Sequence, residues 1–549
     1  MKFVKKNLVL LFILIIGIGC GVTIQKKGLI GLLFQPIVSE PMERIIMHYD
    51  AGIQDVDDLK IILSKKSLKK YKRSLDLAKE FGRGYRLHPQ NPGYIKCKVE
   101  INGLEELGKL KLKGGTSTHF ENKEDKVSLR IKLKKSLFHN MSKFSICYPN
   151  VRNHLNEWFF HKLNKSVGII GLNFEFINVE INHENKGIYA LEENISKQLL
   201  INNGLPEGPI FRFDPDYIWK QSGSLNITPI GKDMFQEAKI KVYNESEVLS
   251  SPLQKVLFIK GKSLLEGFRS GELNASSVFD LKKFASFISV IDLFGEPHGL
   301  GLWNLRFYYN PESERLEPIP YDQSHIHPKV SFYGDRKPIF GESYSLGSRK
   351  KMDFYSLLFS DEEFYKAYVF ELNRVSAPSF LESFLDSIGP EMVSSINILK
   401  KEIEYSNYNF DDELLIIKNN AKYISEYLKP VDCIHGYVNE RDIESNKLMI
   451  EIGNYHHFPI SVLGLYKDSI QVNKLPYEKH MIQAHNNGEL MNHEIISFEG
   501  KNKKDFSNLD SLRVGYKLLG TDRLIFSTLI KWSRREGSNV LGTKSSTVV

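Results

Sequence analysis

Apolar and polar residues alternate in three short segments between residues 94 and 133, and this pattern predicts β-strands. Residues 94–101 and 107–112 are joined by the tight-turn pair Asn102-Gly103, so they predict an antiparallel hairpin. Residues 126–133 alternate without interruption, with apolar residues on one face. The other face carries Lys126, Ser128, Arg130 and Lys132. The first part of the chain is therefore expected to contain a sheet with one cationic face.

Helical spacing of apolar residues dominates the segments that follow. Residues 150–167, 281–293 and 361–428 predict helices that bury one face. The region between 204 and 277 is aromatic and irregular in pattern, and we interpret it as an insertion. From about residue 431 short apolar runs return, separated by Asn, Gly, Lys and Asp, which predicts a small β-sandwich or similar module.

The stretch from Phe294 to Gln323 combines strand, turn and loop patterns. Residues 305–309 and 316–321 predict two short strands around the turn sequence NPESER. Asn304 directly precedes the first strand and Asp322 directly follows the second, so the hairpin brings a carboxamide and a carboxylate to the same end. Oxygen ligands of this kind suit a hard cation such as Mg²⁺ or Mn²⁺. Capping explains the same residues equally well, with Asn304 capping a turn and Asp322 a helix or loop.

A glycine-rich loop follows the second predicted strand. Gly114 and Gly115 lead into Thr116-Ser117-Thr118, so backbone N–H groups and hydroxyls are expected to face a phosphate. The next strand, with Lys126 and Arg130 on its cationic face, would suit a polyphosphate. A solvated outer strand explains the same alternation, and the loop fits neither the P-loop nor the dinucleotide-binding pattern.

The N-terminus indicates export. Three lysines among the first six residues precede an almost wholly apolar run from Leu8 to Ile24. Such a run is a signal peptide or an uncleaved single-pass anchor in the cell membrane, and the leading lysines hold the N-terminus in the cytoplasm. Cys20 adds a lipoprotein as an alternative. We assign residues 1–41 to an anchor and linker, with the bulk of the chain outside the cytoplasm.

Composition narrows the class of protein. A chain of 549 residues with 42% hydrophobic and 26% charged residues is expected to form two or three globular domains. The formal net charge of +8 is modest, and the sequence has no zinc-knuckle or helix-turn-helix spacing, so a nucleic-acid partner is not expected. Three cysteines besides Cys20 lie far apart, and they give no disulfide framework.

The order of these features resembles the CotH kinase family, the spore-coat protein H-like atypical kinases. The resemblance rests on the GG-T/S loop, the Lys-x-Ser-x-Arg strand, the hairpin INHENKGIYALEE, and the sequences HGLGLWNLRFYYN and PIPYDQS. It covers roughly residues 42–430. It implies an α+β, bilobal, protein-kinase-like fold, with an N-lobe at about 42–200, the insertion at about 204–277 and a C-lobe at about 278–430. The β-rich accessory domain would then occupy residues 431–549.

The resemblance also implies an activity, the transfer of the γ-phosphoryl group of ATP to a protein hydroxyl. By the family pattern, Lys126 would contact the nucleotide phosphates and Glu193 would pair with it. Asn304 and Asp322 would hold Mg²⁺ or Mn²⁺. These roles agree with what phosphoryl transfer needs, which is positioning and charge neutralisation by a lysine and metal ions.

One position departs from the family pattern. The family usually has an aspartate five residues before the metal-binding asparagine, where this chain has Gly299. The candidates to replace it as catalytic base are Asp292, Glu296 and His298.

Two functions therefore stay open. One is an extracytoplasmic atypical kinase that acts on an envelope or secreted protein. The other is a catalytically inactive, membrane-anchored scaffold or binding protein for surface-layer or polysaccharide assembly on the same fold.

Overall fold

The computed structural model of the chain describes residues 55–101, 103–120, 126–214, 216, 234–331, 333–344, 353–402, 405–474, 480–485, 491–502 and 504–534. These residues divide into two compact units. The smaller contains residues 55–57 and 392–409, and the larger contains residues 58–391 and those from 410 onward. Helices and several sheets occur along the described chain, so the fold belongs to the mixed α+β class that the sequence predicts.

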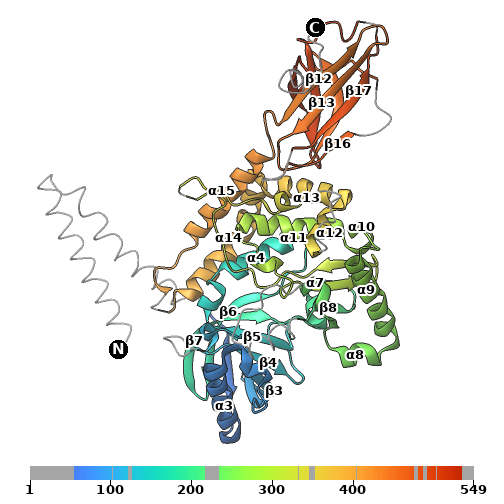
Figure 1. The fold of residues 1–549 in the computed structure, drawn as a ribbon. Coiled ribbons are helices and arrows are strands. Elements are labelled where there is room, and N and C mark those ends of the chain that lie inside the picture. Colours follow the sequence, from blue (N-terminus) through green and yellow to red (C-terminus); the bar gives the residue numbers. More distant parts are fainter. Residues whose placement is uncertain are drawn as a thin grey trace, which may run out of the picture. The chain divides into compact units, whose positions relative to one another are not determined.

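Seven strands of the larger unit close into a barrel in the order β1-β2-β3-β4-β5-β7-β6 (Figure 1). They are β1 (Asp58–Ile62), β2 (Ile95–Ile101), β3 (Leu104–Leu112), β4 (Leu129–Leu133), β5 (Lys143–Cys147), β6 (Phe174–Ile181) and β7 (Glu184–Glu193). Neighbouring strands are antiparallel except β1 and β6, which run parallel with Asp58 opposite Asn178 and so close the barrel. The hairpin predicted over 94–112 is confirmed as β2 and β3.

Alternation along these strands decides what faces the barrel interior. Leu110, Ile131 and Phe144 are fully buried inside, one on each of β3, β4 and β5. The residues between them project from the outer face of the barrel. Lys111 and Arg130 are two of these, and they lie opposite each other in the register of β3 and β4. The cationic strand face that the sequence predicts is therefore the outer face of the barrel.

A helical part surrounds α11 (Leu281–Phe294), in which every residue from Phe284 to Phe294 is buried. Asp280 begins this helix, because its side chain accepts a hydrogen bond from the N–H of Lys283, and Gly295 ends it with a positive φ of 70°. The helix contacts α4, α13 and α15 (Figure 1). The helices of the described chain besides α11 are α3 (Lys65–Phe81), α4 (Asn156–Ser166), α5 (Lys197–Asn202), α7 (Met234–Glu237), α8 (Glu245–Ser250), α9 (Pro252–Ser270), α10 (Ala275–Val278), α12 (Phe354–Phe359), α13 (Glu362–Val375), α14 (Pro378–Leu399) and α15 (Asp411–Tyr427).

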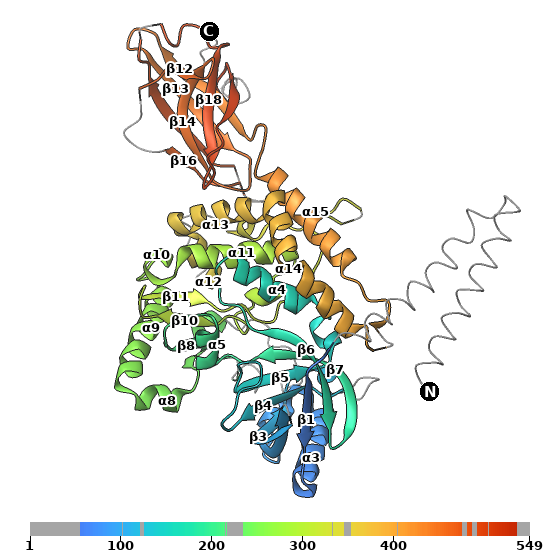
Figure 2. The same ribbon diagram turned by 180° about the vertical axis from the view of Figure 1, so that it is seen from behind.

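A four-stranded sheet carries the central hairpin in the order β11-β10-β8-β9 (Figure 2). Its strands are β8 (Ile210–Phe213), β9 (Ile240–Val242), β10 (Phe307–Asn310) and β11 (Arg315–Pro318). The hairpin around NPESER is thus confirmed. We expected irregular structure between residues 204 and 277, and this expectation is wrong for much of the region. It contains β8, β9, α8 and α9. Helix α9 forms because Leu257, Leu265 and Phe268 recur at helical spacing and are buried.

The C-terminal residues form an eight-stranded sheet in the order β15-β14-β18-β19-β12-β13-β17, with β16 paired to β14. Its strands are β12 (Ile434–Asp442), β13 (Lys447–Asn454), β14 (Ile460–Lys467), β15 (Ile470–Gln471), β16 (His480–Ile482), β17 (His493–Glu499), β18 (Leu512–Leu518) and β19 (Ile525–Ile530). The β-rich character predicted beyond residue 431 is therefore observed. Phe458, between β13 and β14, packs edge-on against Tyr365 and Tyr368 of α13.

The membrane anchor predicted for residues 1–41 lies outside the described residues. Within the part of the chain that the structure describes, no helix combines the length and the apolar character needed to cross a bilayer.

Candidate functional site

A cavity of about 1200 Å³ lies between the outer face of the barrel strands β3 to β5 and the segments on either side of the β10–β11 hairpin. Residues far apart in the sequence meet on its walls. Those predicted for a functional site are Gly114, Gly115, Arg130, His298, Asn304 and Asp322. The structure therefore brings the glycine loop, one strand cation and both proposed metal ligands to one cavity.

Two cations and two carboxylates form a connected group at this cavity, and we call it the central charge group. Lys113 Nζ lies 2.6 Å from Glu192 Oε1. Arg152 Nε lies 3.0 Å from the other oxygen of Glu192, and Arg152 Nη1 pairs with Asp322 Oδ1. The side chains of Lys113, Arg152 and Glu192 are almost completely buried. The group is formally neutral and links the barrel to the loop that follows the hairpin.

Burial disfavours the charged form of each member of this group, but the pairing outweighs burial. Arg152 and Lys113 hold the pKa of the Glu192 carboxyl well below its ordinary value. Arg152, followed by His298, lowers the pKa of the Asp322 carboxyl in the same way, against the effect of burial. Asp322 and Glu192 in turn raise the pKa of the Arg152 guanidinium. All of these groups are therefore charged at neutral pH.

Asp322 holds a backbone conformation that few residues adopt. It follows β11 with a positive φ of 62°, which costs energy for most residues other than Gly, Asn and Asp. Its N–H donates to Glu157 Oε1 at 2.9 Å, and its carbonyl oxygen lies 2.6 Å from His298 Nδ1. These two contacts hold the loop so that the carboxylate meets Arg152.

The contact between His298 and Asp322 fixes the tautomer of the imidazole. A carbonyl oxygen only accepts hydrogen bonds, so His298 Nδ1 must carry the hydrogen. The Nε2 atom of the neutral ring then has a free lone pair that can take a proton. His298 begins the turn η4 (His298–Leu300) and lines the cavity.

Asn304 and Asp322 are brought together through the same histidine. Asn304 Nδ2 donates to the His298 carbonyl oxygen at 3.0 Å, while His298 Nδ1 donates to Asp322. Their remaining oxygens suit Mg²⁺, which binds one or two protein oxygens and completes its shell with phosphate oxygens and water. Among the described residues, no group of three or more His, Cys, Asp or Glu side chains is arranged to hold a metal ion.

The glycine loop is shaped by a partly buried histidine. Gly114 has a φ of +88°, and a Cβ atom at this position would lie 2.0 Å from the ring of His119. Burial lowers the pKa of His119 to about 3, so the ring is neutral, and its Nδ1 lies 3.0 Å from Ser128 Oγ. The Gly114 carbonyl oxygen accepts from Tyr85 Oη and Arg86 Nε. Only glycine fits the loop at this position.

Lys126 and Glu193 make hydrogen bonds to different partners. Lys126 is buried, and its Nζ donates a hydrogen bond to the Ile188 carbonyl oxygen at 3.2 Å. The Glu193 carboxylate accepts from Asn173 N at 2.9 Å and Asn202 Nδ2 at 2.7 Å, and burial raises its pKa. Their roles toward the nucleotide, which the resemblance implies, stay predictions. The lysine–glutamate pair that lies at the cavity is Lys113 with Glu192.

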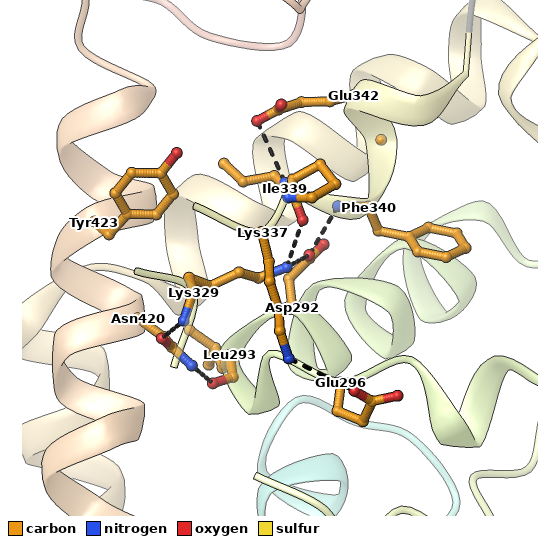
Figure 3. A network of polar contacts seen from close by, with 12 residues as sticks. Asp292, Leu293, Glu296, Lys329, Lys337, Ile339, Phe340, Glu342, Asn420 and Tyr423 are labelled. Atoms are coloured by element: carbon orange, nitrogen blue, oxygen red, sulfur yellow. Dashed lines mark hydrogen bonds and ion pairs between the residues drawn. The ribbon is translucent and has the colours of Figure 1, made fainter. Parts of the chain in front are cut away.

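Asp292 and Glu296, two of the three candidate bases, are engaged elsewhere (Figure 3). Asp292 is buried and accepts from Lys329 Nζ at 2.8 Å, from Phe340 N at 2.9 Å and from Tyr368 Oη at 2.7 Å. Glu296 lies 3.8 Å from Lys337 Nζ. The contacts of Asp292 tie α11 to the loop before α12 and to α13. Of the three candidates, His298 is the one on the cavity wall.

Sequence reasoning missed Lys113, Arg152 and Glu192. Lys113 continues the alternation of Lys109 and Lys111 by one further step, so the strand pattern contained its signal. Glu192 precedes Glu193 directly, and strand alternation alone does not tell which of two adjacent glutamates faces a ligand. Arg152 ends the short turn η3 (Pro149–Arg152), and no hydrophobic periodicity or motif in the sequence marks it as a site residue.

Comparison with models of protein families identifies a match over most of the described chain. The family model described as CotH kinase protein matches residues 99–442 of this chain. That span contains the barrel strands from β3 onward, the central charge group and the β10–β11 hairpin. No curated protein matches the chain.

Proposed function

The chain belongs to the CotH kinase family, and on that premise we propose that it is a kinase that transfers the γ-phosphoryl group of ATP to a hydroxyl of an envelope or secreted protein. In this proposal the domain is bilobal, with an N-lobe over about 42–200, an insertion over about 204–277 and a C-lobe over about 278–430. Residues 431–549 are a β-sandwich-like accessory module.

The observation that carries this proposal is the meeting of three features at one cavity: the buried Lys113–Glu192 pair, the Asn304–Asp322 pair and the glycine loop. Phosphoryl transfer requires little covalent help from a protein. It requires a lysine held by a glutamate, a carboxylate and a carboxamide for the metal, and N–H groups near the phosphates. In our proposal Gly114 and Gly115 supply these N–H groups. Lys113 has the role toward the phosphates that the resemblance gives to Lys126.

His298 is our candidate for the base. The acceptor oxygen attacks the γ-phosphorus, the bond to the β–γ bridging oxygen breaks, and ADP leaves. The hydroxyl proton passes to His298 Nε2, which carries the lone pair of the neutral ring because the ring hydrogen is on Nδ1, where it donates to the Asp322 carbonyl oxygen. A histidine base beside Gly299 would replace the aspartate that is usual in the family.

Asn304 and Asp322 are the residues that would hold Mg²⁺ or Mn²⁺. When bound, such an ion neutralises charge on the β- and γ-phosphate oxygens. The role of the protein would be to present the side-chain oxygens of Asn304 and Asp322 to the ion. Arg152 keeps the Asp322 carboxylate ionised and in place for this.

We place this activity outside the cytoplasm. The lysines and the apolar run within residues 1–41 support a single-pass anchor in the cell membrane, with a lipoprotein at Cys20 as the alternative. The acceptor would then be a protein of the envelope or a secreted protein.

An inactive scaffold on the same fold is the second candidate, and the packing around Gly299 favours it. A Cβ atom at Gly299 would lie 2.9 Å from Ile291 Cδ1 and 3.1 Å from Gln323 Oε1, and the Gly299 N–H donates to the same Gln323 oxygen at 2.6 Å. The space for the usual aspartate is therefore filled. Without a base, the protein would bind nucleotide or surface polymers without transfer.

Calorimetry with the full chain and a non-hydrolysable ATP analogue tests the proposal. We expect binding that depends on Mg²⁺ or Mn²⁺ and that weakens at least tenfold in Asp322→Asn. Asparagine tolerates the left-handed backbone at this position, so this change removes charge without removing the conformation. Asp386→Asn, on the exposed side of α14, is the matched control. A folded wild-type protein that binds no nucleotide would overturn the kinase proposal.

A further inference from the structure

Four cations lie together on the outer face of the barrel, and we call them the cationic wall. Lys111 on β3 lies opposite Arg130 on β4, and Lys143 begins the neighbouring strand β5. Arg86 reaches the same region, where its Nε donates to the Gly114 carbonyl oxygen at 3.1 Å. All four line the cavity.

The described part of the chain gives these cations no carboxylate partner. The charged groups that act on Lys111 are Arg130 and Arg86, and those that act on Lys143 are Arg130, Lys111 and Lys132. Burial, followed by these neighbours, lowers the pKa of both ammonium groups to about 8. The Nε atom of Arg130 is buried and has no hydrogen-bond partner among the described residues. Within the described residues, the cationic wall therefore carries uncompensated positive charge and an unused donor.

The central charge group, one step along the same strand, is arranged in the opposite way. Lys113 and Arg152 face two carboxylates there, and each charge is matched within the protein. Partly buried like charges repel and lose hydration unless a counter-charge is supplied. Lysine and arginine side chains make strong hydrogen bonds to ionised carboxylate and phosphate oxygens, and a phosphate group offers more acceptor oxygens to several cations at once. An anion rich in phosphate-type oxygens is the ligand that would satisfy the cationic wall.

We propose that the cationic wall is a binding subsite for a polyanion with several phosphate-type groups, which binds beside the nucleotide as part of the acceptor. Its role as acceptor rests on the proposed kinase function. The central charge group and the metal ligands serve the γ-phosphoryl group, so the cationic wall is left for a second ligand. The acceptor hydroxyl would then belong to a molecule that already carries phosphate groups.

Calorimetry with inorganic tripolyphosphate as the probe tests this inference on the full chain. The titration is done at a fixed excess of Mg²⁺ and 150 mM salt, with and without a saturating non-hydrolysable ATP analogue. We expect tripolyphosphate to bind in both cases. We expect the double variant Lys111→Gln/Lys143→Gln to weaken tripolyphosphate binding at least tenfold and to change nucleotide affinity less than about twofold.

The matched control is Lys96→Gln/Lys109→Gln, since these exposed lysines face each other on β2 and β3, outside the cavity lining. We expect it to leave both affinities unchanged. Arg130→Gln is a second test variant, in case the double variant does not fold by circular dichroism.

Two possible sources of the phosphate charge are separated by the same titrations. If the ATP analogue abolishes tripolyphosphate binding, the cationic wall holds the phosphates of the nucleotide itself and the inference is overturned. Absence of tripolyphosphate binding, or equal binding by test and control variants, overturns it as well. If tripolyphosphate binds but no nucleotide does, the subsite stands and the kinase proposal fails.

Discussion

Lys113 and Glu192 show how much depends on one buried ion pair. Removing one partner of a buried pair costs about 3–5 kcal/mol, and without Lys113 the single cation Arg152 would face the two carboxylates of Glu192 and Asp322. We therefore expect Lys113→Met to lower the free energy of unfolding by about this amount and to weaken nucleotide binding. Guanidinium denaturation and calorimetry measure the two effects. In Lys98→Met, at the half-exposed Lys98–Glu105 pair of β2 and β3, the loss should stay below about 1 kcal/mol. Equal losses in both variants would contradict the importance of burial.

His298 is the residue whose loss should separate chemistry from binding. We expect His298→Gln to slow ADP formation by about 10²–10⁴, because a general base contributes this much, and to leave nucleotide affinity unchanged. The exposed His327 lies in the same loop region, and His327→Gln is the control. If the two variants turn over ATP at the same rate, His298 takes no part in proton transfer.

At the scale of elements, strand alternation and the hairpin pattern were predictable from the sequence, and the partners across space were not. The hairpin placed Asn304 and Asp322 correctly at one end, because its turn chemistry is local. Arg152 lies 170 residues before Asp322 in the chain, and no local sequence pattern predicts the contact between their side chains. Asp292 shows the same limit. Its position before the loop makes it a candidate base, and no local pattern shows that its carboxylate accepts hydrogen bonds from Lys329 (Figure 3) and from Tyr368.

The glycine loop makes a prediction about an element and its neighbour. A positive φ costs alanine about 1–2 kcal/mol, and this applies to Gly114 and to Gly93, which has a φ of +62°. At Gly114 the new Cβ atom also meets the ring of His119, whereas nothing lies within 4 Å at Gly93. We expect Gly114→Ala to destabilise by roughly 3 kcal/mol or more, since overpacking adds its own cost, and to weaken nucleotide binding.

The second variant His119→Ala tests the cause of that loss. Added to Gly114→Ala, it removes the obstructing ring and should restore part of the stability, as measured by urea denaturation. Gly93→Ala should show only the conformational cost. If Gly93→Ala is as harmful as Gly114→Ala, close packing on His119 does not constrain the loop.

For the whole molecule, stability should fall in mild acid. Burial lowers the pKa of His119 to about 3 and that of His456 to about 4, whereas both titrate near 6.5 in an unfolded chain. Below about pH 6.5 the unfolded state therefore binds more protons than the folded state. Stability is complete above that pH and decreases as the pH is lowered toward these values. His119 lies at the cavity and His456 lies between β13 and β14 of the C-terminal sheet, so both regions contribute.

The expected loss between pH 7.5 and pH 5 is about 4 kcal/mol, roughly 2 kcal/mol for each histidine. Chemical denaturation at the two pH values measures it. The double variant His119→Gln/His456→Gln should lose much less over the same interval, although it starts from a lower stability. His183→Gln, at a largely exposed side chain, is the control and should retain the full pH dependence. A double variant with the same pH dependence as wild type would assign the effect to other groups.

The parallel pairing of β1 with β6 also has a consequence for folding during synthesis on the ribosome. The ribosome makes β1 about 110 residues before β6, the strand that closes the barrel against it. At about 5–20 residues per second, the nascent chain must wait roughly 6–20 seconds for its partner. During that time one edge of β1 has no strand of its own chain to pair with. Unpaired strand edges can form hydrogen bonds with other chains, which leads to aggregation. Chaperone capture during synthesis would thus act first on the segment around residues 58–62.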